Sequence, residues 1–281
     1  MTTPRDCIVC HASDPRVLYL CDEEFVSTLV FKGHRRAYTI CECSRCGLVY
    51  VGERVTDDLL TELYGAEYYQ GRDSTGFVDY SAQERKYRAR FAGRLERMAP
   101  HLGDAGRVLD VGCALGWFLA EASQRGWQAE GLELSDYCAQ FVKERFDLPV
   151  RAATLPDAGY DEGTFDFVTL WDTVEHLVDP RTTLEHAHRV LKAGGRIALS
   201  TGNVRSVRSR IKGKQWALVR PPKHLYYFSP ETLELLVQDC GFEVRFVWQE
   251  LPGKIPRPLR RALTRLTDHA GDIFGMLAVK R

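Results

Sequence analysis

The sequence predicts an α/β fold, in which a doubly wound, seven-stranded sheet follows a small zinc-ribbon-like domain at the N-terminus. Two observations support this prediction. From Arg107 onward, short apolar runs alternate with amphipathic stretches, which is typical of strands alternating with helices around a parallel sheet. Six of the nine cysteines lie within the first 46 residues, and four of these form two pairs whose members are separated by two residues.

Seven apolar runs are the expected strands. They are Arg107–Val111, Gln128–Glu133, Val150–Ala153, Phe165–Trp171, Arg196–Thr201, Glu243–Trp248 and Ile273–Val279. Amphipathic stretches between the first five strands predict helices at Gly116–Arg125, Asp136–Phe146 and Pro180–Leu191. We divide the chain into a zinc-binding domain at residues 1–52, a helical connector at 53–100 and the large domain at 101–281.

The composition limits the class of protein. The chain has 281 residues and a hydrophobic content of 44%, enough for one large core and a small second module. No run of about 18 apolar residues occurs, and no apolar signal region follows the polar start Met1–Asp6, so we expect a cytoplasmic protein without a membrane span. The balance of 38 basic and 38 acidic residues disfavours a protein that coats nucleic acid, although a local basic patch stays open.

Four cysteines in the N-terminal domain have the spacing of metal ligands. Two intervening residues let both thiolates of a pair reach one tetrahedral ion, and the glycine after the second pair permits a tight turn. We therefore expect a structural Zn²⁺ held by Cys7, Cys10, Cys43 and Cys46. His11, Cys21 and Cys41 are alternative ligands. Two segments between the cysteine pairs, Val26–Phe31 and Ala37–Ile40, have the composition of strands.

The connector is expected to be helical. Leu59, Leu60, Leu63 and Tyr64 follow helical spacing. The segment from Ser81 to Met98 is polar with interspersed apolar residues, and we expect Pro100 to end it.

The first strand of the large domain leads into a glycine turn. Asp110 and Val111 end the first strand, and Gly112 and Gly116 mark the turn that opens the following helix. Such a turn lets the backbone approach a ligand closely. Glu133 ends the next strand, where a carboxylate can accept hydrogen bonds from both ribose hydroxyls of an adenosine.

These segments resemble class I S-adenosylmethionine (SAM)-dependent methyltransferases, which have a Rossmann-like sheet. Asp110–Gly116 resembles their first motif, Phe165–Leu177 their fourth, and Arg189–Gly195 the turn before their fifth strand. The resemblance implies that SAM is the cofactor and that its contacts include Tyr69, Asp110, Gly112, Cys113, Gly116, Glu133, Leu134, Thr154, Leu155 and Trp171. A nicotinamide enzyme is the alternative, but the turn lacks its Gly-x-Gly-x-x-Gly pattern.

Two positions depart from that family's pattern. Ala114 stands where many members have a second glycine, and we expect only a slight change in the turn. The segment Ala152–Leu155 lacks the acid that often binds the adenine amino group, so that contact is left to the backbone or to Asp157.

The N-terminal half resembles a narrower bacterial subgroup. The resemblance is to methyltransferases of polysaccharide and secondary-metabolite pathways. It covers the four-cysteine module, Cys46–Tyr50 and the tyrosines Tyr64, Tyr68 and Tyr69, and the later segment Lys223–Leu233 is also similar to that subgroup. That resemblance implies a hydroxyl of a sugar, a glycan or another small metabolite as the acceptor.

A hydroxyl acceptor benefits from a base that removes its proton. Our candidates are His176, which follows the fourth strand, His224, which stands beside Tyr226 and Tyr227, and Glu175. Tyr68 and Tyr69 are candidates to close over SAM or to pack.

Seven basic residues and no acid lie between Val204 and Pro230. They are Arg205, Arg208, Arg210, Lys212, Lys214, Arg220 and Lys223. We expect this basic segment to form part of the acceptor pocket, with His224 and the adjacent tyrosines at its wall, and hence an anionic acceptor. RNA, recognised with the help of the zinc domain, is the alternative acceptor, and global neutrality disfavours it.

Overall fold

A seven-stranded sheet forms the centre of the computed structural model, which describes residues 5–27, 36–56, 59, 83–251 and 270–281. Its strands lie in the order β10 (Phe242–Glu250), β11 (Ile273–Lys280), β8 (Leu191–Gly202), β7 (Phe165–Trp171), β4 (Arg107–Val111), β5 (Gln128–Leu132) and β6 (Val150–Arg151). The predicted α/β fold class is confirmed, and each of the seven expected strands is present.

The sheet is mixed. Strands β4 to β8 pair in parallel, whereas β11 is antiparallel to both of its neighbours, β8 and β10. From β4 the chain builds outward through β5 and β6 and then returns to β7 on the other side of β4. In open α/β sheets ligands bind at the carboxyl ends of the strands where the order reverses, so this topology places a site between β4 and β7.

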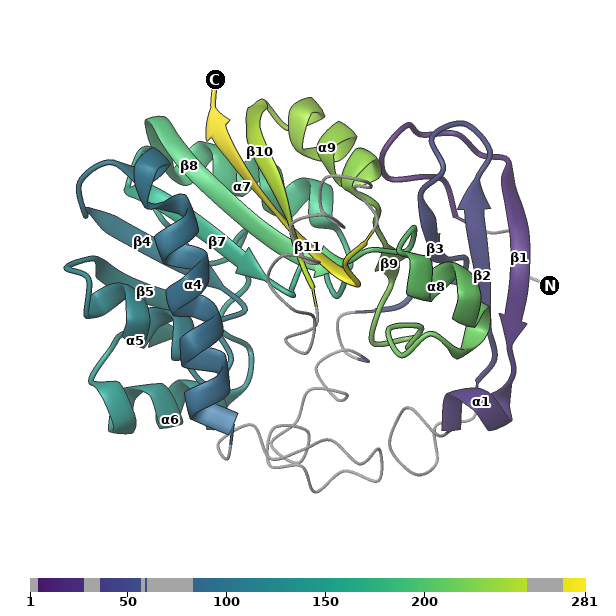
Figure 1. Cartoon of the computed structure of the whole chain (residues 1–281), viewed down its shortest axis with the longest axis horizontal. Helices are drawn as coiled ribbons and strands as arrows, with labels where there is room; N and C mark the ends of the chain where they lie inside the picture. The colour runs from purple at the N-terminus through teal and green to yellow at the C-terminus, as the bar shows by residue number, and fades with distance from the viewer. Residues whose placement is uncertain (1–4, 28–35, 57–58, 60–82, 252–269) are drawn as a thin grey trace.

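The helices of the connector and the large domain are α4 (Glu84–Leu102), α5 (Trp117–Ser123), α6 (Asp136–Phe146), α7 (Pro180–Val190), α8 (Val207–Lys212) and α9 (Pro230–Asp239), with a short 3₁₀ helix η2 (Gly213–Gln215). Helices α5, α6 and α7 confirm the three predicted between the strands, and α4 lies in the expected helical connector, whereas α8 and α9 were not predicted. Figure 1 shows α4 beside α5 and α6, next to the β4 half of the sheet. None of the described helices combines the length and apolar character needed to cross a bilayer.

The expectation that Pro100 ends the connector helix is wrong. Pro100 lies inside α4, which continues to Leu102 and stops before Gly103 at φ 72°. A proline in the last turn costs one backbone hydrogen bond. Burial of Met98 and Leu102 against the core of the sheet offsets that cost, because both side chains are at most 5% exposed.

A second sheet forms at the N-terminus, and a strand from the large domain completes it. Its order is β1 (Pro15–Cys21), β2 (Tyr38–Cys43), β3 (Val49–Val51) and β9 (Tyr226–Tyr227), with every pair antiparallel. One apolar cluster runs from Ile40 in this sheet to Leu199 in the large one. The four-cysteine module is therefore packed onto the large domain (Figure 1, right).

The strand expected at Val26–Phe31 is wrong over its described part. Val26 lies in a short helix, α1 (Glu23–Ser27), and residues 28–31 lie outside the described residues. The Asp22 side chain accepts a hydrogen bond from the Phe25 N–H at 2.8 Å, and two glutamates occupy the first turn, which favours a helix start. The strand of this module that precedes it, β1, was not predicted.

Candidate functional site

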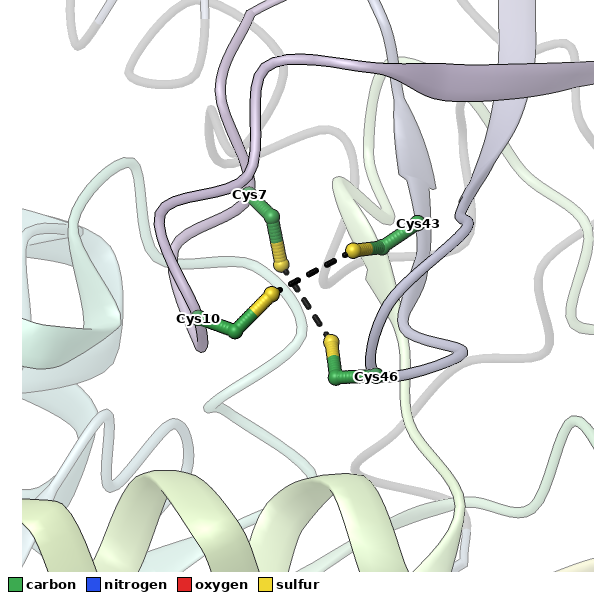
Figure 2. Close-up of side chains that lie close together, drawn as sticks. All are labelled: Cys7, Cys10, Cys43 and Cys46. Carbon is green, nitrogen blue, oxygen red and sulfur yellow. Dashed lines mark hydrogen bonds between the residues drawn. The ribbon is translucent and has the colours of Figure 1, made fainter.

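Four cysteine sulfurs converge in the N-terminal module. Cys7 and Cys10 come from one loop and Cys43 and Cys46 from another, and Figure 2 shows the four side chains pointing toward a common centre. The Sγ atoms of Cys7 and Cys46 are 3.4 Å apart, as are those of Cys10 and Cys43. Tetrahedral ligands at the zinc–sulfur distance of 2.3 Å would be about 3.8 Å apart, so the donor set fits Zn²⁺.

The two loops share one backbone design. The residue after each second cysteine, His11 or Gly47, has a positive φ and donates its N–H to the carbonyl of the first cysteine. Backbone N–H groups of each loop also face the sulfur of that first cysteine, at Cys7 and Cys43. Such donors favour a thiolate, which is the form that binds a metal.

The alternative ligands lie apart from this cluster. His11 forms the turn and its side chain is exposed, while Cys21 and Cys41 are buried in β1 and β2 and do not belong to the converging set. The structure thus brings together the four residues that the paired spacing singled out.

The turn after β4 has the conformation expected of a close ligand approach. Gly112, Ala114 and Gly116 all have positive φ, and the amides of Gly112 and Cys113 both donate to the Leu132 carbonyl on β5. A Cβ on Gly112 would lie 2.8 Å from Thr173, so the position excludes larger residues. Ala114 adopts a left-handed conformation that glycine takes more readily, which costs about 1–2 kcal/mol.

Glu133 lies directly after β5 and faces the same turn. Its carboxylate accepts hydrogen bonds from the N–H of Ala114 and the N–H of Ser135, each at 3.0 Å, and the residue is 7% exposed. A carboxylate has about four acceptor positions, so two backbone donors orient it without exhausting it.

A cavity of about 680 Å³ opens at the carboxyl ends of β4, β5 and β7. Among the predicted residues its walls include Asp110, Gly112, Cys113, Glu133, Leu134, Thr154, Leu155, Trp171, His176 and His224. Asp157, proposed for the adenine contact, also lines it. This volume lies within the range of natural small-molecule pockets.

Two of the predicted cofactor residues are not among those that line the cavity: Gly116 is placed elsewhere, and Tyr69 is not described. Gly116 does not line the cavity: a Cβ there would lie 2.6 Å from Val142, so the glycine lets the start of α5 pack against α6. Tyr69, like Tyr64 and Tyr68, lies outside the described residues, and so do Leu60 and Leu63 of the connector.

Asp110 and Trp171 line the cavity floor. Burial raises the pKa of the Asp110 carboxyl to about 8, and Thr169 Oγ1 donates to it at 2.7 Å. The Arg94 guanidinium lies 4.6 Å from the centroid of the Trp171 ring. Asp110 is 2% exposed although it lines the cavity, so its carboxyl is almost fully shielded from water.

Two of the three candidate bases, His176 and His224, lie together in the cavity wall, which the third candidate, Glu175, also lines. The ring centroids of His176 and His224 are 4.6 Å apart, although 47 residues separate the two in sequence. His176 Nδ1 donates to the Lys223 carbonyl at 2.8 Å. Burial lowers the pKa of His176 to about 4 and also holds the pKa of His224 well below its usual value. Both rings are therefore neutral near pH 7.

Sequence reasoning missed an ionic cluster at the cavity wall. Arg90 of α4 donates to Asp172 and to Glu250, at 2.7 Å each, and Arg94 donates to Glu250 at 2.6 Å. Burial alone would raise the pKa of Asp172, but Arg90 and Arg94 outweigh it and hold that pKa well below the usual range. Asp172 follows the last residue of β7 and has φ 51°, a position that no sequence pattern indicated.

The basic segment contributes less to the cavity than we expected. Of its seven residues Arg220 alone lines the cavity. Arg208 pairs with Asp272 and Lys214 with Asp22, both at 3.3 Å. The adjacent tyrosines form β9 in the N-terminal sheet and are buried there rather than at the cavity wall, so their predicted place is wrong.

Comparisons with known proteins agree with this geometry. A family model described as a methyltransferase domain matches residues 83–246. The ubiquinone biosynthesis O-methyltransferase of Alkalilimnicola ehrlichii is 28% identical over 189 residues, covering 62% of this chain and 74% of that protein. The enzyme of the same name from Pseudomonas paraeruginosa is 31% identical over 159 residues, covering 51% and 67%. A SAM-dependent methyltransferase structure from Archaeoglobus fulgidus has a TM-score of 0.54 at 20% identity, covering 72% of this chain and 100% of that one.

The sheet order, the turn after β4 and the carboxylate after β5 define the class, that of enzymes that transfer a methyl group from SAM. The chain belongs to the methyltransferase domain family, whose model spans more than half of its length.

Proposed function

We propose that this chain is an O-methyltransferase that moves the methyl group of SAM to a hydroxyl of a small, anionic acceptor. The observation that supports cofactor binding best is the Glu133 carboxylate, held by the Ala114 and Ser135 amides beside the glycine turn. Hydroxyl chemistry is supported by the relatives, which are named O-methyltransferases.

SAM supplies a methyl group on a sulfonium, which is already a good leaving group. The chain's own residues then have to bind, align and exclude water. We assign Glu133 to the ribose hydroxyls, the Gly112 backbone to the close approach of the cofactor, and Leu134 and Leu155 to its apolar contacts, because all four line one part of the cavity.

The acceptor side of the cavity is assigned to Glu175, His176, Arg220 and His224. As the bond from sulfur to methyl carbon breaks and the bond from carbon to acceptor oxygen forms, the hydroxyl proton has to leave. A neutral imidazole has a lone pair that can accept this proton. Arg220 contributes a positive charge for an anionic group on the acceptor.

The narrower proposal of a sugar or glycan acceptor gains no support from the relatives, whose names refer to ubiquinone biosynthesis. We also keep the structural Zn²⁺ at the four cysteines as a proposal, supported by their convergence. RNA as the acceptor is disfavoured by the balanced net charge and by the ion pairs of Arg208 and Lys214, which offset part of the basic segment.

Calorimetry with SAM and a transfer assay test the proposal together. We expect one SAM bound per chain, and transfer of a tritium-labelled methyl group to small phenols or sugar phosphates in a probe panel. Absence of SAM binding would refute the cofactor site. Transfer to RNA, with none to any small acceptor, would replace the acceptor class with the alternative.

A further inference from the structure

Three metal-binding side chains converge at the acceptor end of the cavity. Glu175 and His176 follow β7, and His224 comes from the loop before β9. One ligand atom of each lies within 4.8 Å of the others, and all three residues line the cavity. This cluster is separate from the four cysteines.

The histidines are oriented as metal ligands usually are. His176 uses Nδ1–H to donate to the Lys223 carbonyl, which leaves the lone pair on Nε2. The ring of His224 is hydrogen-bonded to the Leu218 carbonyl. In metal sites the second ring nitrogen of a ligating histidine almost always donates to a carbonyl or carboxylate, which fixes the tautomer and the ring.

The carboxylate supplies an independent indication of a ligand. Glu175 is 4% exposed, and its Oε2 has no hydrogen-bond partner within the described part of the chain. A buried carboxylate oxygen without a partner costs about 1–3 kcal/mol or more. A cation bound by Glu175 and the two imidazoles would give this carboxylate a partner.

The donor set indicates the class of cation. Two imidazoles and one carboxylate suit a first-row divalent ion such as Zn²⁺ or Mn²⁺, whereas Mg²⁺ prefers oxygen ligands. Three protein ligands leave coordination positions open, as in catalytic metal sites, and here the open side is the cavity itself.

We propose that Glu175, His176 and His224 bind one divalent transition-metal ion that coordinates the acceptor hydroxyl. This inference rests on the proposed methyl transfer and specifies how its acceptor is activated. Coordination lowers the pKa of a hydroxyl, so its proton passes to water at the cavity mouth while the oxygen attacks the methyl carbon and the carbon–sulfur bond breaks. The two histidines then act as ligands rather than as the base.

The test uses Mn²⁺ as the probe on the full chain carrying one Zn²⁺ per chain, which the four cysteines retain because thiolate sites favour zinc over manganese. Electron paramagnetic resonance should count one Mn²⁺ per chain, and pulsed measurements should detect coupling to imidazole nitrogens. Glu175→Gln, His176→Ala and His224→Ala should each weaken Mn²⁺ binding by about 10-fold or more. The control is His188→Ala, since His188 lies against Phe242, away from the cavity.

SAM calorimetry on the same samples separates the two proposals and verifies that each variant is folded. Normal SAM affinity together with no bound Mn²⁺, no nitrogen coupling, or equal Mn²⁺ affinity in all variants would overturn the metal site and leave the methyltransferase proposal intact. Absence of SAM binding in a protein that binds Mn²⁺ as described would instead contradict the proposed function.

Discussion

Replacing Glu133 with alanine should weaken SAM binding without removing the cavity. In the structure its carboxylate is 7% exposed and is aimed by two backbone amides at 3.0 Å, so it is held in place before a ligand arrives. Charge-assisted hydrogen bonds to two ribose hydroxyls would then be lost in the variant. We expect a loss of about 1–3 kcal/mol, or about 5- to 150-fold in the dissociation constant.

Calorimetry with SAM measures this change, and Glu130→Ala is the matched control. Glu130 lies on β5, three residues before Glu133, but pairs with Arg107 at 2.8 Å and does not line the cavity. Because Glu133→Ala also leaves the Ala114 and Ser135 amides without their acceptor, its thermal unfolding has to be recorded as well. A folded Glu133→Ala variant that binds SAM as tightly as the wild type would refute the assignment of the ribose contact.

Three further outcomes are expected. Cys43→Ser combined with Cys46→Ser should lower the zinc content by one ion per chain, measured by elemental analysis; full retention would contradict the four-cysteine site. Arg220→Glu should raise the Michaelis constant for an anionic acceptor by about 10-fold or more at unchanged SAM affinity. Arg208 lies outside the cavity, so Arg208→Glu should leave that constant unchanged. Equal kinetics in the two variants would remove the argument for an anionic acceptor. Arg94→Met should lower the free energy of unfolding at pH 7 by about 3 kcal/mol, the low end for a broken buried pair, because Arg90 still pairs with Glu250. Burial alone would raise the pKa of Glu250, but Arg94 and Arg90 lower it. The stabilisation by this ion pair is therefore present at neutral pH and is lost as the pH falls through the folded-state pKa of Glu250. Denaturant unfolding that shows the same difference in free energy between wild type and variant at pH 7 and below pH 4 would contradict the reasoning.

The parts of the fold that could be predicted are those determined by local sequence. The turn after β4 and the acid after β5 lie on consecutive strands, so Gly112 and Glu133 could be placed from spacing alone. Strand β7 and helix α6 were predicted with the residue boundaries that the structure has.

What could not be predicted depends on contacts between distant segments. Nothing near Arg90 indicates that it meets Asp172, 82 residues later, because α4 has to pack on the sheet before the two side chains approach. The role of the basic segment was misjudged for the same reason. Arg208 belongs to the same segment as Arg220, which lines the cavity, but its ion-pair partner Asp272 lies 64 residues later in the chain. His176 and His224 were both named, yet their contact required the fold.

The pairing of β3 with β9 gives the N-terminal module a role in the acceptor site. Leu225, the residue after His224, donates its N–H to the Glu175 carbonyl at 2.8 Å and accepts from the Val51 N–H at 2.9 Å. The loop that bears His224 is therefore held between the segment after β7, which bears Glu175, and strand β3 of the N-terminal sheet. Arg5, two residues before Cys7, adds a 2.8 Å hydrogen bond to the Tyr226 hydroxyl.

This connection changes what a metal at the four cysteines would do for the enzyme. An ion there would crosslink the two loops that precede β1 and β3, and so would stabilise the strand against which β9 pairs. Strands β4 and β5, which carry the cofactor half of the cavity, do not pair with any strand of the N-terminal sheet among the described residues. Loss of the cysteine centre should consequently impair the acceptor side first, through the position of His224, while the Glu133 end keeps its geometry. We therefore expect this small module, which cannot form a large core alone, to support the wall of the cavity that bears His224.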